Sequence, residues 1–259
     1  MDILEIMQAL NACHGPSGNE GQVAAAIRTL AAPYVDEITT DALGNLICHK
    51  QGAGPRVMFA AHMDSIGFII THIDEHGYLR FGQVGGLSAH DLPGTPVRFR
   101  NGTRGVVAVQ GKVEPKDWKL DHLYIDIGAK DQAEAKTMVQ VGDTAVFDTT
   151  PFVSGRKLFS PYLDDRIACA ILLSAMERIK RADNDLYFVF TVQEEVGLRG
   201  ARTAAYGIAP DYGIAVDVTD SDDIPDAPHE CSSAAGKGAA IKVMDSSVIC
   251  HPAVVKTLE

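Results

Sequence analysis

Short apolar runs and helical apolar patterns alternate near both ends of the chain. Residues 57–61 and 186–192 are unalternating apolar runs, which are typical of strands buried on both faces of a sheet. Apolar positions three and four residues apart predict helices at residues 2–13, 18–32 and 166–180. A further helix is expected from Ala201, followed by a strand at residues 212–218. This order of strands and helices predicts an α/β domain.

Two local patterns refine the first part of this domain. Ser17 is followed three residues later by Glu20, which predicts a capping box at the start of the second helix. Residues 39–49 are expected to form two short strands on either side of Gly44 and Asn45.

The middle of the chain has a different pattern, in which short β-like runs alternate with turns. Asn101 and Gly102 form the strongest of these turns and predict a hairpin. Only residues 131–139 have a helical pattern. We therefore expect a small β-barrel-like domain at residues 69–158, inserted into an α/β domain that consists of residues 1–68 and 159–259.

The composition excludes several classes of protein and partner. The 259-residue chain has 23 Lys and Arg against 34 Asp and Glu, a net charge of −11, and no basic run, so nucleic acid is not an expected partner. No apolar stretch reaches the length of a membrane span and no secretory leader is evident, so a cytoplasmic protein without a membrane partner is expected. The five cysteines include no Cys-x-x-Cys pair, which argues against a disulfide framework and a thiolate zinc site.

Polar residues with metal-binding side chains follow the predicted strands or begin the predicted helices. In open α/β sheets the carboxyl ends of the strands carry the ligand sites, so these residues are expected to lie close together. One imidazole with several carboxylates suits zinc, cobalt or manganese better than calcium or magnesium. Taken singly, each motif has a simpler interpretation, such as a solvated acidic loop or a helix N-terminus. The residues are His62, Asp64, Asp164, Glu194, Glu195 and Asp217.

The stretches around these residues resemble the tetrahedral-type aminopeptidases, a family that includes glutamyl and deblocking aminopeptidases. The resemblance implies an α/β three-layer sandwich of the di-metal exopeptidase type with an inserted small β-barrel-like domain. It extends over essentially the whole chain. The matching stretches are Ala-His-Met-Asp-Ser-Ile-Gly-Phe at residues 61–68, Leu-Asp-Asp-Arg at 163–166, Glu-Glu-Val-Gly-Leu-Arg-Gly-Ala at 194–201, Ala-Val-Asp-Val-Thr at 215–219, and residues 123–129 and 141–147 of the inserted domain.

The resemblance also implies a ligand set for two divalent metal ions, zinc or cobalt, with manganese also suitable. His62, Asp164 and Asp217 are expected to bind one ion. Asp164 is expected to bridge to the second ion, which Glu195 also binds. Asp64 is expected to accept the other ring N–H of His62 and so to orient the imidazole.

Glu194 is the expected general base of a reaction in which a metal-activated water hydrolyses a peptide bond. The implied function is that of a metal-dependent aminopeptidase, acting on peptides with a free N-terminus. The family forms homo-oligomers from dimers to dodecamers. Related di-metal carboxypeptidases and amide deacylases are the alternative, although their extra domain usually follows the later ligands.

The sequence departs from the family pattern in two places. Ser65 stands where a carboxylate is usual. Family members also continue for roughly eighty to a hundred residues beyond position 259, and that segment carries the last histidine ligand of the second metal. Neither His229 nor His251 lies in a matching stretch. The α/β domain is therefore expected to be incomplete at its C-terminus, and the chain to be weakly active or an inactive truncated subunit.

Overall fold

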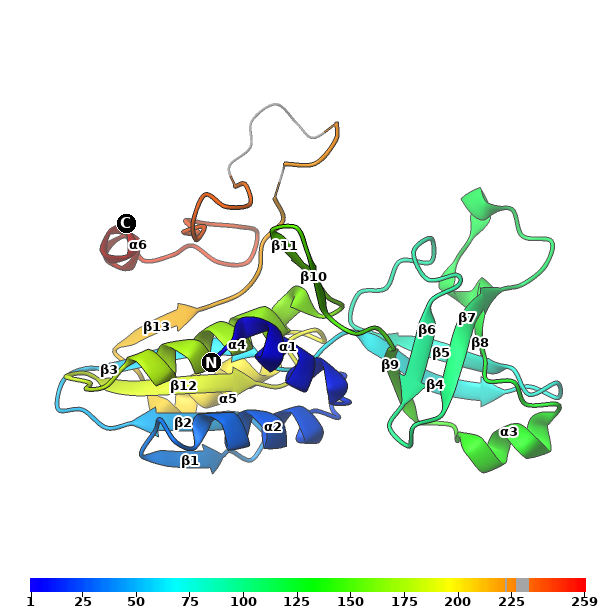
Figure 1. The fold of residues 1–259 in the computed structure, drawn as a ribbon, viewed down its shortest axis with the longest axis horizontal. Coiled ribbons are helices and arrows are strands. Elements are labelled where there is room, and N and C mark those ends of the chain that lie inside the picture. The colour runs from blue at the N-terminus through cyan, green and yellow to red at the C-terminus, as the bar shows by residue number, and fades with distance from the viewer. Residues whose placement is uncertain (222, 227–232) are drawn as a thin grey trace. The chain divides into compact units, whose positions relative to one another are not determined.

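A computed structural model describes residues 1–221, 223–226 and 233–259 of the chain. It divides into two compact units, Met1–Asp217 and Val218–Glu259. The first unit contains an open five-stranded sheet with its helices and a closed six-stranded barrel (Figure 1).

The open sheet has the strand order β1-β2-β12-β3-β13. Strand β12 is parallel to β3 and antiparallel to β2, so the sheet is mixed. Thr191 at the end of β12 is paired with His62 at the end of β3, which brings the carboxyl ends of these two strands to one edge. The strands are β1 (Glu37–Thr40), β2 (Leu46–Lys50), β3 (Arg56–His62), β12 (Asp185–Thr191) and β13 (Tyr212–Ala215).

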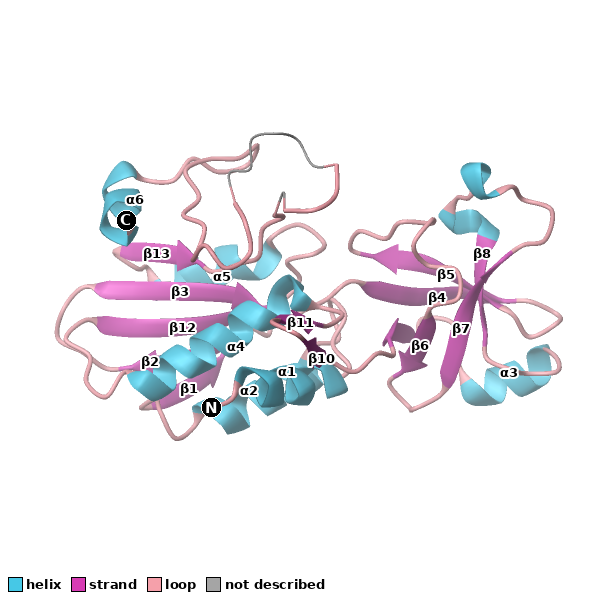
Figure 2. Cartoon of the chain, turned by 45° about the horizontal axis from the view of Figure 1, so that its top comes forward, coloured by secondary structure: helices cyan, strands magenta, loops and turns pink. Residues whose placement is uncertain are grey.

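Helices cover both faces of this sheet, which makes three layers (Figure 2). The helices α1 (Ile3–Ala12), α2 (Gly21–Ala31) and α4 (Leu163–Arg178) bury a large apolar cluster against one face. The helix α5 (Arg199–Ile208) packs on the other face through Ala204 and Ile208, against Met58 and Val189. The predicted three-layer α/β architecture is confirmed.

The residues between β3 and α4 form the expected barrel. Its closed order is β4-β5-β8-β7-β6-β9, and its interior is filled by apolar side chains such as Phe68, Phe99 and Ile125. Strands β6 and β7 form the predicted hairpin at Asn101 and Gly102. The elements are β4 (Gly67–Ile73), β5 (Leu79–Val84), β6 (Pro96–Phe99), β7 (Arg104–Val109), η1 (Pro115–Asp117), η2 (Leu120–His122), β8 (Leu123–Asp126), α3 (Gln132–Met138) and β9 (Thr144–Phe147).

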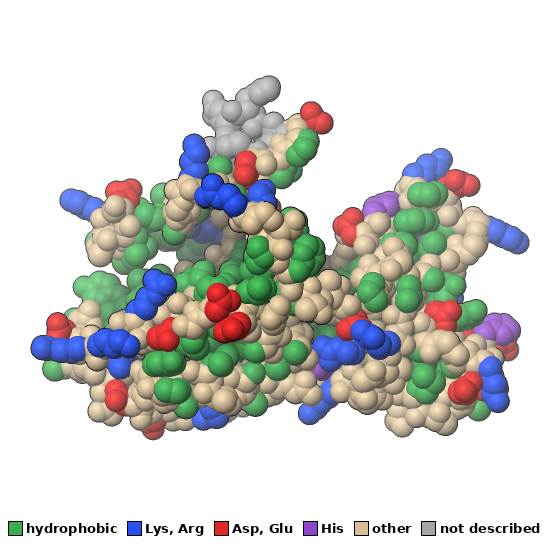
Figure 3. Space-filling view, viewed as in Figure 1, with side chains coloured by type: hydrophobic (Ala, Val, Ile, Leu, Met, Phe, Trp, Pro, Cys, Tyr) green, Lys and Arg blue, Asp and Glu red, His purple; other side chains and the backbone are tan. Residues whose placement is uncertain are grey.

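A short hairpin of β10 (Phe152–Ser154) and β11 (Lys157–Phe159) connects the barrel to α4. The rings of Phe152 and Phe159 are stacked with their centroids 5.2 Å apart, yet both side chains are exposed. In Figure 3 hydrophobic side chains gather over this hairpin, whereas acidic and basic side chains are interspersed over the same face of the molecule. The hairpin thus exposes a pair of stacked aromatic side chains.

The start of α2 differs from the prediction. The helix begins at Gly21 with Glu20 as its N-cap residue, and no side chain caps it. The Ser17 hydroxyl instead donates to the carboxylate of Asp64 at 2.6 Å, and the Glu20 carboxylate accepts the backbone amide of Gly18 at 2.7 Å. The predicted capping box is therefore wrong, because both side chains have other partners.

The second unit contains one helix among its described residues, α6 (Pro252–Leu258). His251 is its N-cap residue and accepts the amide of Ala253 at 3.3 Å, as expected of a residue at a helix start. His229 lies outside the described residues. In the part of the chain that the structure describes, no helix has both the length and the apolar composition needed to cross a lipid bilayer.

Candidate metal and catalytic site

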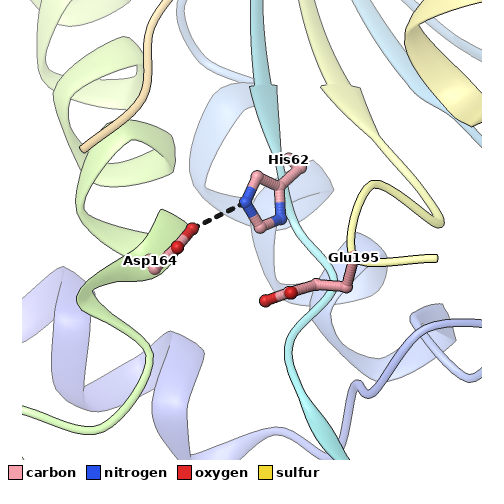
Figure 4. A group of neighbouring side chains, drawn as sticks. All are labelled: His62, Asp164 and Glu195. Carbon is pink, nitrogen blue, oxygen red and sulfur yellow. Dashed lines mark hydrogen bonds and ion pairs between the residues drawn. The ribbon is translucent and has the colours of Figure 1, made fainter. Parts of the chain in front are cut away.

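His62 is the last residue of β3 and is almost completely buried. Its Nε2 lies 2.8 Å from Oδ1 of Asp164 at the start of α4 (Figure 4). Its Nδ1 lies 3.2 Å from the backbone carbonyl oxygen of Asp64, two residues further along the chain, and 3.4 Å from Oδ1 of the same residue. Burial alone would lower the pKa of His62, but the hydrogen bonds to Asp164 and Asp64 raise that pKa to about 11. The imidazole is therefore held between two carboxylates.

Asp164 and Asp165 have non-helical backbone angles at the start of α4, and their side chains have different surroundings. The side chain of Asp164 is 60% exposed, whereas Asp165 is fully buried. Oδ2 of Asp165 accepts the backbone amide of His62 at 3.1 Å, and Oδ1 has no hydrogen-bond partner among the described residues. Burial, with the nearby charge of Asp217, raises the pKa of Asp165 to about 9.

Glu194 and Glu195 lie in the loop after β12, and the backbone of this loop is hydrogen-bonded to the buried carboxylate of Asp64. Asp64 is fully buried, and its two oxygens accept the amides of Glu194 at 3.0 Å and Glu195 at 3.2 Å. The hydroxyl of Ser17 donates to the same carboxylate. Burial would raise the pKa of Asp64, but hydrogen bonds from His62 and Ser17 hold it below its usual value.

Among the residues that the structure describes, two groups of side chains could each hold a metal ion, and both include His62. In each group one nitrogen and two carboxylate oxygens lie within 4.8 Å of one another. Figure 4 shows the first group, in which the side chains come from β3, α4 and the loop after β12. The groups are His62 with Asp164 and Glu195, and His62 with Asp165 and Asp217.

The chemistry of these groups fits divalent ions. A nitrogen with several carboxylate oxygens is a donor set that zinc, cobalt and manganese accept. Burial and the charge of Asp164 raise the pKa of Glu195 to about 7. Burial, with the charges of Asp217 and Asp64, raises the pKa of Glu194, and His62 opposes this rise. A cation would relieve the repulsion between these carboxylates.

The sequence-predicted residues all lie at this edge of the sheet. Oε2 of Glu194 is 3.9 Å from Nε2 of His62, beside the first group. Asp64 belongs to neither group and lies behind His62. The expected set of His62 with Asp164 and Asp217 differs from the observed group in one residue, because Asp217 lies with Asp165.

Asp165 is a possible ligand that the sequence did not single out. In the sequence it is the second of two aspartates at a predicted helix start, where capping explains an acidic residue. The second of two adjacent aspartates can point into the site as well as the first. Only the backbone angles at the helix start decide which one is buried.

The barrel also contributes to the site, through the turn after β5. Gly85 has a left-handed backbone with φ +73°, and a Cβ atom there would lie 2.9 Å from Oε2 of Glu195. The same atom would lie 2.7 Å from the side chain of Ile66. This turn therefore approaches Glu195 so closely that a larger residue would displace the side chains of Ile66 and Glu195 and strain the backbone.

Comparison with protein families matches residues 44–259 to the M42 glutamyl aminopeptidase family. A protein of Acetivibrio thermocellus, provisionally named an aminopeptidase, is 48% identical over 259 residues, which are all of this chain and 78% of the relative. A lysyl aminopeptidase of Pyrococcus furiosus is 38% identical over 233 residues, 83% of this chain and 66% of the relative.

Solved structures with the same fold include two archaeal peptidases. An aminopeptidase from Desulfurococcus kamchatkensis superimposes with a TM-score of 0.94 at 37% identity, over 99% of this chain and 75% of that one. The TET1 peptidase of Pyrococcus horikoshii, described as assembling into a tetrahedron or a large octahedral shell, has a TM-score of 0.78 at 32% identity. That match covers 86% of this chain and 72% of the archaeal one.

Proposed function

The chain belongs to the M42 glutamyl aminopeptidase family, and we propose that it provides the metal-dependent site of an aminopeptidase that removes N-terminal residues from peptides. The observation that carries this proposal is the convergence of His62, Asp164 and Glu195 within 4.8 Å of one another, with Glu194 beside them. These side chains come from three segments that the sheet brings to one edge.

We propose that His62, Asp164 and Glu195, with Asp217 and Asp165 nearby, hold two divalent ions of the zinc, cobalt or manganese type. When bound, such ions act as Lewis acids that polarise the scissile carbonyl and make water a stronger nucleophile at neutral pH. The protein's own contribution is the placement of the ligands. The backbone carbonyl of Asp64 lies 3.2 Å from Nδ1 of His62 and its carboxylate 3.4 Å, and we propose that Asp64 thereby directs the other ring nitrogen into the site.

Glu194 is the proposed general base. Its carboxylate lies 3.9 Å from the imidazole of His62, and burial raises its pKa above the usual value, so that the group binds a proton more readily. It accepts the proton of the attacking water and later donates it to the nitrogen of the departing peptide. Glu195, its neighbour, serves as a ligand, so the two adjacent carboxylates have different roles.

The replacement Glu194→Gln tests this assignment. The amide cannot accept the proton, so turnover of aminoacyl anilides with added cobalt or zinc should fall by about 100-fold to 10,000-fold. Metal stoichiometry, measured on the same sample, should not change, because Glu194 is not a proposed ligand. Glu134→Gln in the exposed helix α3 is the matched control. Undiminished turnover in Glu194→Gln would refute the assigned base.

We also propose that the protein forms a homo-oligomer, in which the exposed β10–β11 hairpin contributes to the contact between copies. Phe152 and Phe159 present stacked rings to solvent, and exposed apolar features of this kind commonly mark interfaces. Light scattering after gel filtration should give a smaller species for Phe152→Ser combined with Phe159→Ser. Tyr206→Ser, at a side chain that is also highly exposed, should leave the wild-type mass.

A further inference from the structure

We propose that Ser17 and Glu20, in the loop between α1 and α2, are positioning residues for the turn that carries Glu194 and Glu195. This inference rests on the proposed function for its catalytic consequence, whereas its effect on metal binding can be measured independently. Neither residue lies in either group of candidate ligands. Each acts on the site through a hydrogen bond to another part of the chain.

Three consecutive backbone amides at the end of β12 each donate to a buried carboxylate. Gln193 N donates to Oε1 of Glu20 at 3.2 Å, and the amides of Glu194 and Glu195 donate to Asp64 at 3.0 and 3.2 Å. Successive amides that point to one side form an anion-binding concavity. Because these amides donate to the buried carboxylates of Glu20 and Asp64, the two carboxylates fix the backbone conformation of the turn.

The first residue of this turn needs such support. Gln193 has φ +55°, in the left-handed region that residues other than glycine seldom adopt. Its amide is the one that Glu20 binds, and the Glu20 side chain is itself buried. The same carboxylate oxygen also accepts the amide of Gly18, so Glu20 joins its own loop to the glutamate turn.

Ser17 acts one step further from the glutamates. Its hydroxyl donates at 2.6 Å to Oδ2 of Asp64, the oxygen that also accepts the Glu195 amide. Oδ1 accepts the Glu194 amide and lies 3.4 Å from Nδ1 of His62. Without the hydroxyl, the Asp64 carboxylate would lose one of the donors that fix its plane, and both the imidazole and the turn depend on that plane.

The loop between α1 and α2 is hydrogen-bonded and packed against neighbouring parts of the chain, so Ser17 and Glu20 lie on a fixed backbone. The carbonyl of Gly15 accepts the amide and the hydroxyl of Ser65 and the guanidinium of buried Arg166. A Cβ atom at Gly15 would lie 2.4 Å from Val23, so the loop is closely packed against α2. The hydroxyl of Ser65 thus supports the loop.

The sharpest test compares side chains that differ in one hydrogen bond. Ser17→Ala should weaken the affinity for zinc, titrated by calorimetry, by about 10-fold to 100-fold, and should lower kcat more than it raises KM. Ser17→Thr keeps the hydroxyl and should restore both values. Should Ser17→Ala not fold, Ser17→Thr and Ser17→Val, which have the same shape, give the same comparison.

Glu20 is tested in the same way. Glu20→Ala removes the acceptor for the Gln193 amide and should lower kcat, whereas Glu20→Gln keeps a carbonyl oxygen there and should retain most of the wild-type rate. Asn19→Ala is the control within the loop, because the Asn19 side chain makes no hydrogen bond within the described residues. It should match the wild type in zinc affinity and turnover.

The possible outcomes separate this inference from the proposed function. A lower melting temperature in Ser17→Ala, with zinc affinity and kcat unchanged, would show a merely structural role and overturn the proposal. If the wild type binds zinc but cleaves no aminoacyl anilide, the proposed function fails. The zinc affinities of the Ser17 variants would still decide whether the loop positions the site.

Discussion

The carboxylate of Asp64 and the backbone amide of Glu194 are joined by a 3.0 Å hydrogen bond, although 130 positions separate them in the sequence. The bond connects the end of β3, where His62 lies, with the loop after β12, where the adjacent glutamates lie. Asp64 is fully buried, so water cannot substitute for a missing partner. The placement of His62, a candidate ligand, and that of Glu194, the proposed base, therefore depend on one carboxylate.

The replacement Asp64→Asn should separate these two parts of the site. The side-chain amide of Asn has one acceptor oxygen, and its NH₂ group can only donate. The NH₂ group would therefore lie against the N–H of His62 or against a backbone N–H, which is also a donor, and the hydrogen bond there would be lost. We expect metal affinity or kcat to fall by about 10-fold to 100-fold. Zinc calorimetry and steady-state rates on one preparation would measure both values.

A matched control for Asp64→Asn is Asp74→Asn in the barrel. The Asp74 carboxylate also accepts two backbone amides, those of His76 at 3.0 Å and Tyr78 at 2.9 Å, but it lies in the turn between β4 and β5 and belongs to neither group of candidate ligands. The variant Asp74→Asn should be less stable than the wild type but should keep the wild-type affinity for zinc. Equal loss of zinc affinity in the two variants would contradict the role given to Asp64.

Gly85→Ala should damage the site from the barrel side. The new methyl group would meet both Ile66 and the carboxylate of Glu195, and the residue would have to keep φ +73°. We expect a loss of about 1 kcal/mol or more in unfolding free energy, together with weaker zinc binding. Gly86→Ala is the matched control, because a Cβ atom there meets nothing within 4 Å. Urea denaturation and zinc titration would check both, and identical behaviour of the two variants would contradict the prediction.

The architecture could be predicted because it depends on patterns that are local in sequence. The apolar runs at residues 57–61 and 186–192 correspond to β3 and β12, and the rule that ligand sites lie at the carboxyl ends of strands placed His62 and the glutamates near one another. The barrel could be predicted because the middle of the sequence consists of short β-like runs separated by turn residues.

The supporting contacts could not be predicted, because their partners are distant in sequence. Ser17 and Glu20 match a capping box by spacing alone, yet Ser17 donates to Asp64, 47 positions away, and Glu20 accepts the amide of Gln193, 173 positions away, as well as that of Gly18. The inward orientation of Asp165 depends on backbone angles at a helix start, which an Asp-Asp pair does not determine. The close approach of Gly85 depends on how the barrel packs.

Added metal should stabilise the folded protein. The candidate ligands place several carboxylates close together, and burial with the charge of Asp164 raises the pKa of Glu195 to about 7. An ion that binds only the folded state at 100 times its Kd adds about 2.7 kcal/mol. Thermal unfolding should therefore shift upward with zinc or cobalt, and removal by a chelator should reverse the shift.

The variant Glu195→Gln provides the control for that measurement. It removes one charged ligand from the first group, so the zinc-induced shift should shrink. Magnesium should give a smaller shift than zinc in the wild type, because a site with an imidazole nitrogen suits zinc better. A zinc-induced shift of the same size in Glu195→Gln would show that the ion binds elsewhere.

His14 has an unusual environment for a histidine outside the candidate site. It is buried, and its Nε2 lies 2.8 Å from the hydroxyl of Thr144 in β9. Its Nδ1 has no partner within the described residues. Burial, together with the charges of nearby arginines, lowers the pKa of His14 to about 4, and one acidic neighbour opposes this shift. The charged groups around it are Arg98, Arg100, Arg166 and Asp143.

Stability should therefore fall with acid through the titration of His14. The pKa is about 4 in the folded protein against 6.5 for the free side chain, so the unfolded chain binds the proton first as the pH falls. The contribution of neutral His14 to the free energy of unfolding is roughly 3 kcal/mol. It is fully present above pH 6.5 and is lost progressively as the pH falls to about 4.

The variant His14→Gln has no titrating group at this position, so its unfolding free energy, measured in urea, should decline less steeply over this range than that of the wild type. His76→Gln, at an exposed histidine, should keep the wild-type slope. Parallel curves for His14→Gln and the wild type would show that another group governs the acid response.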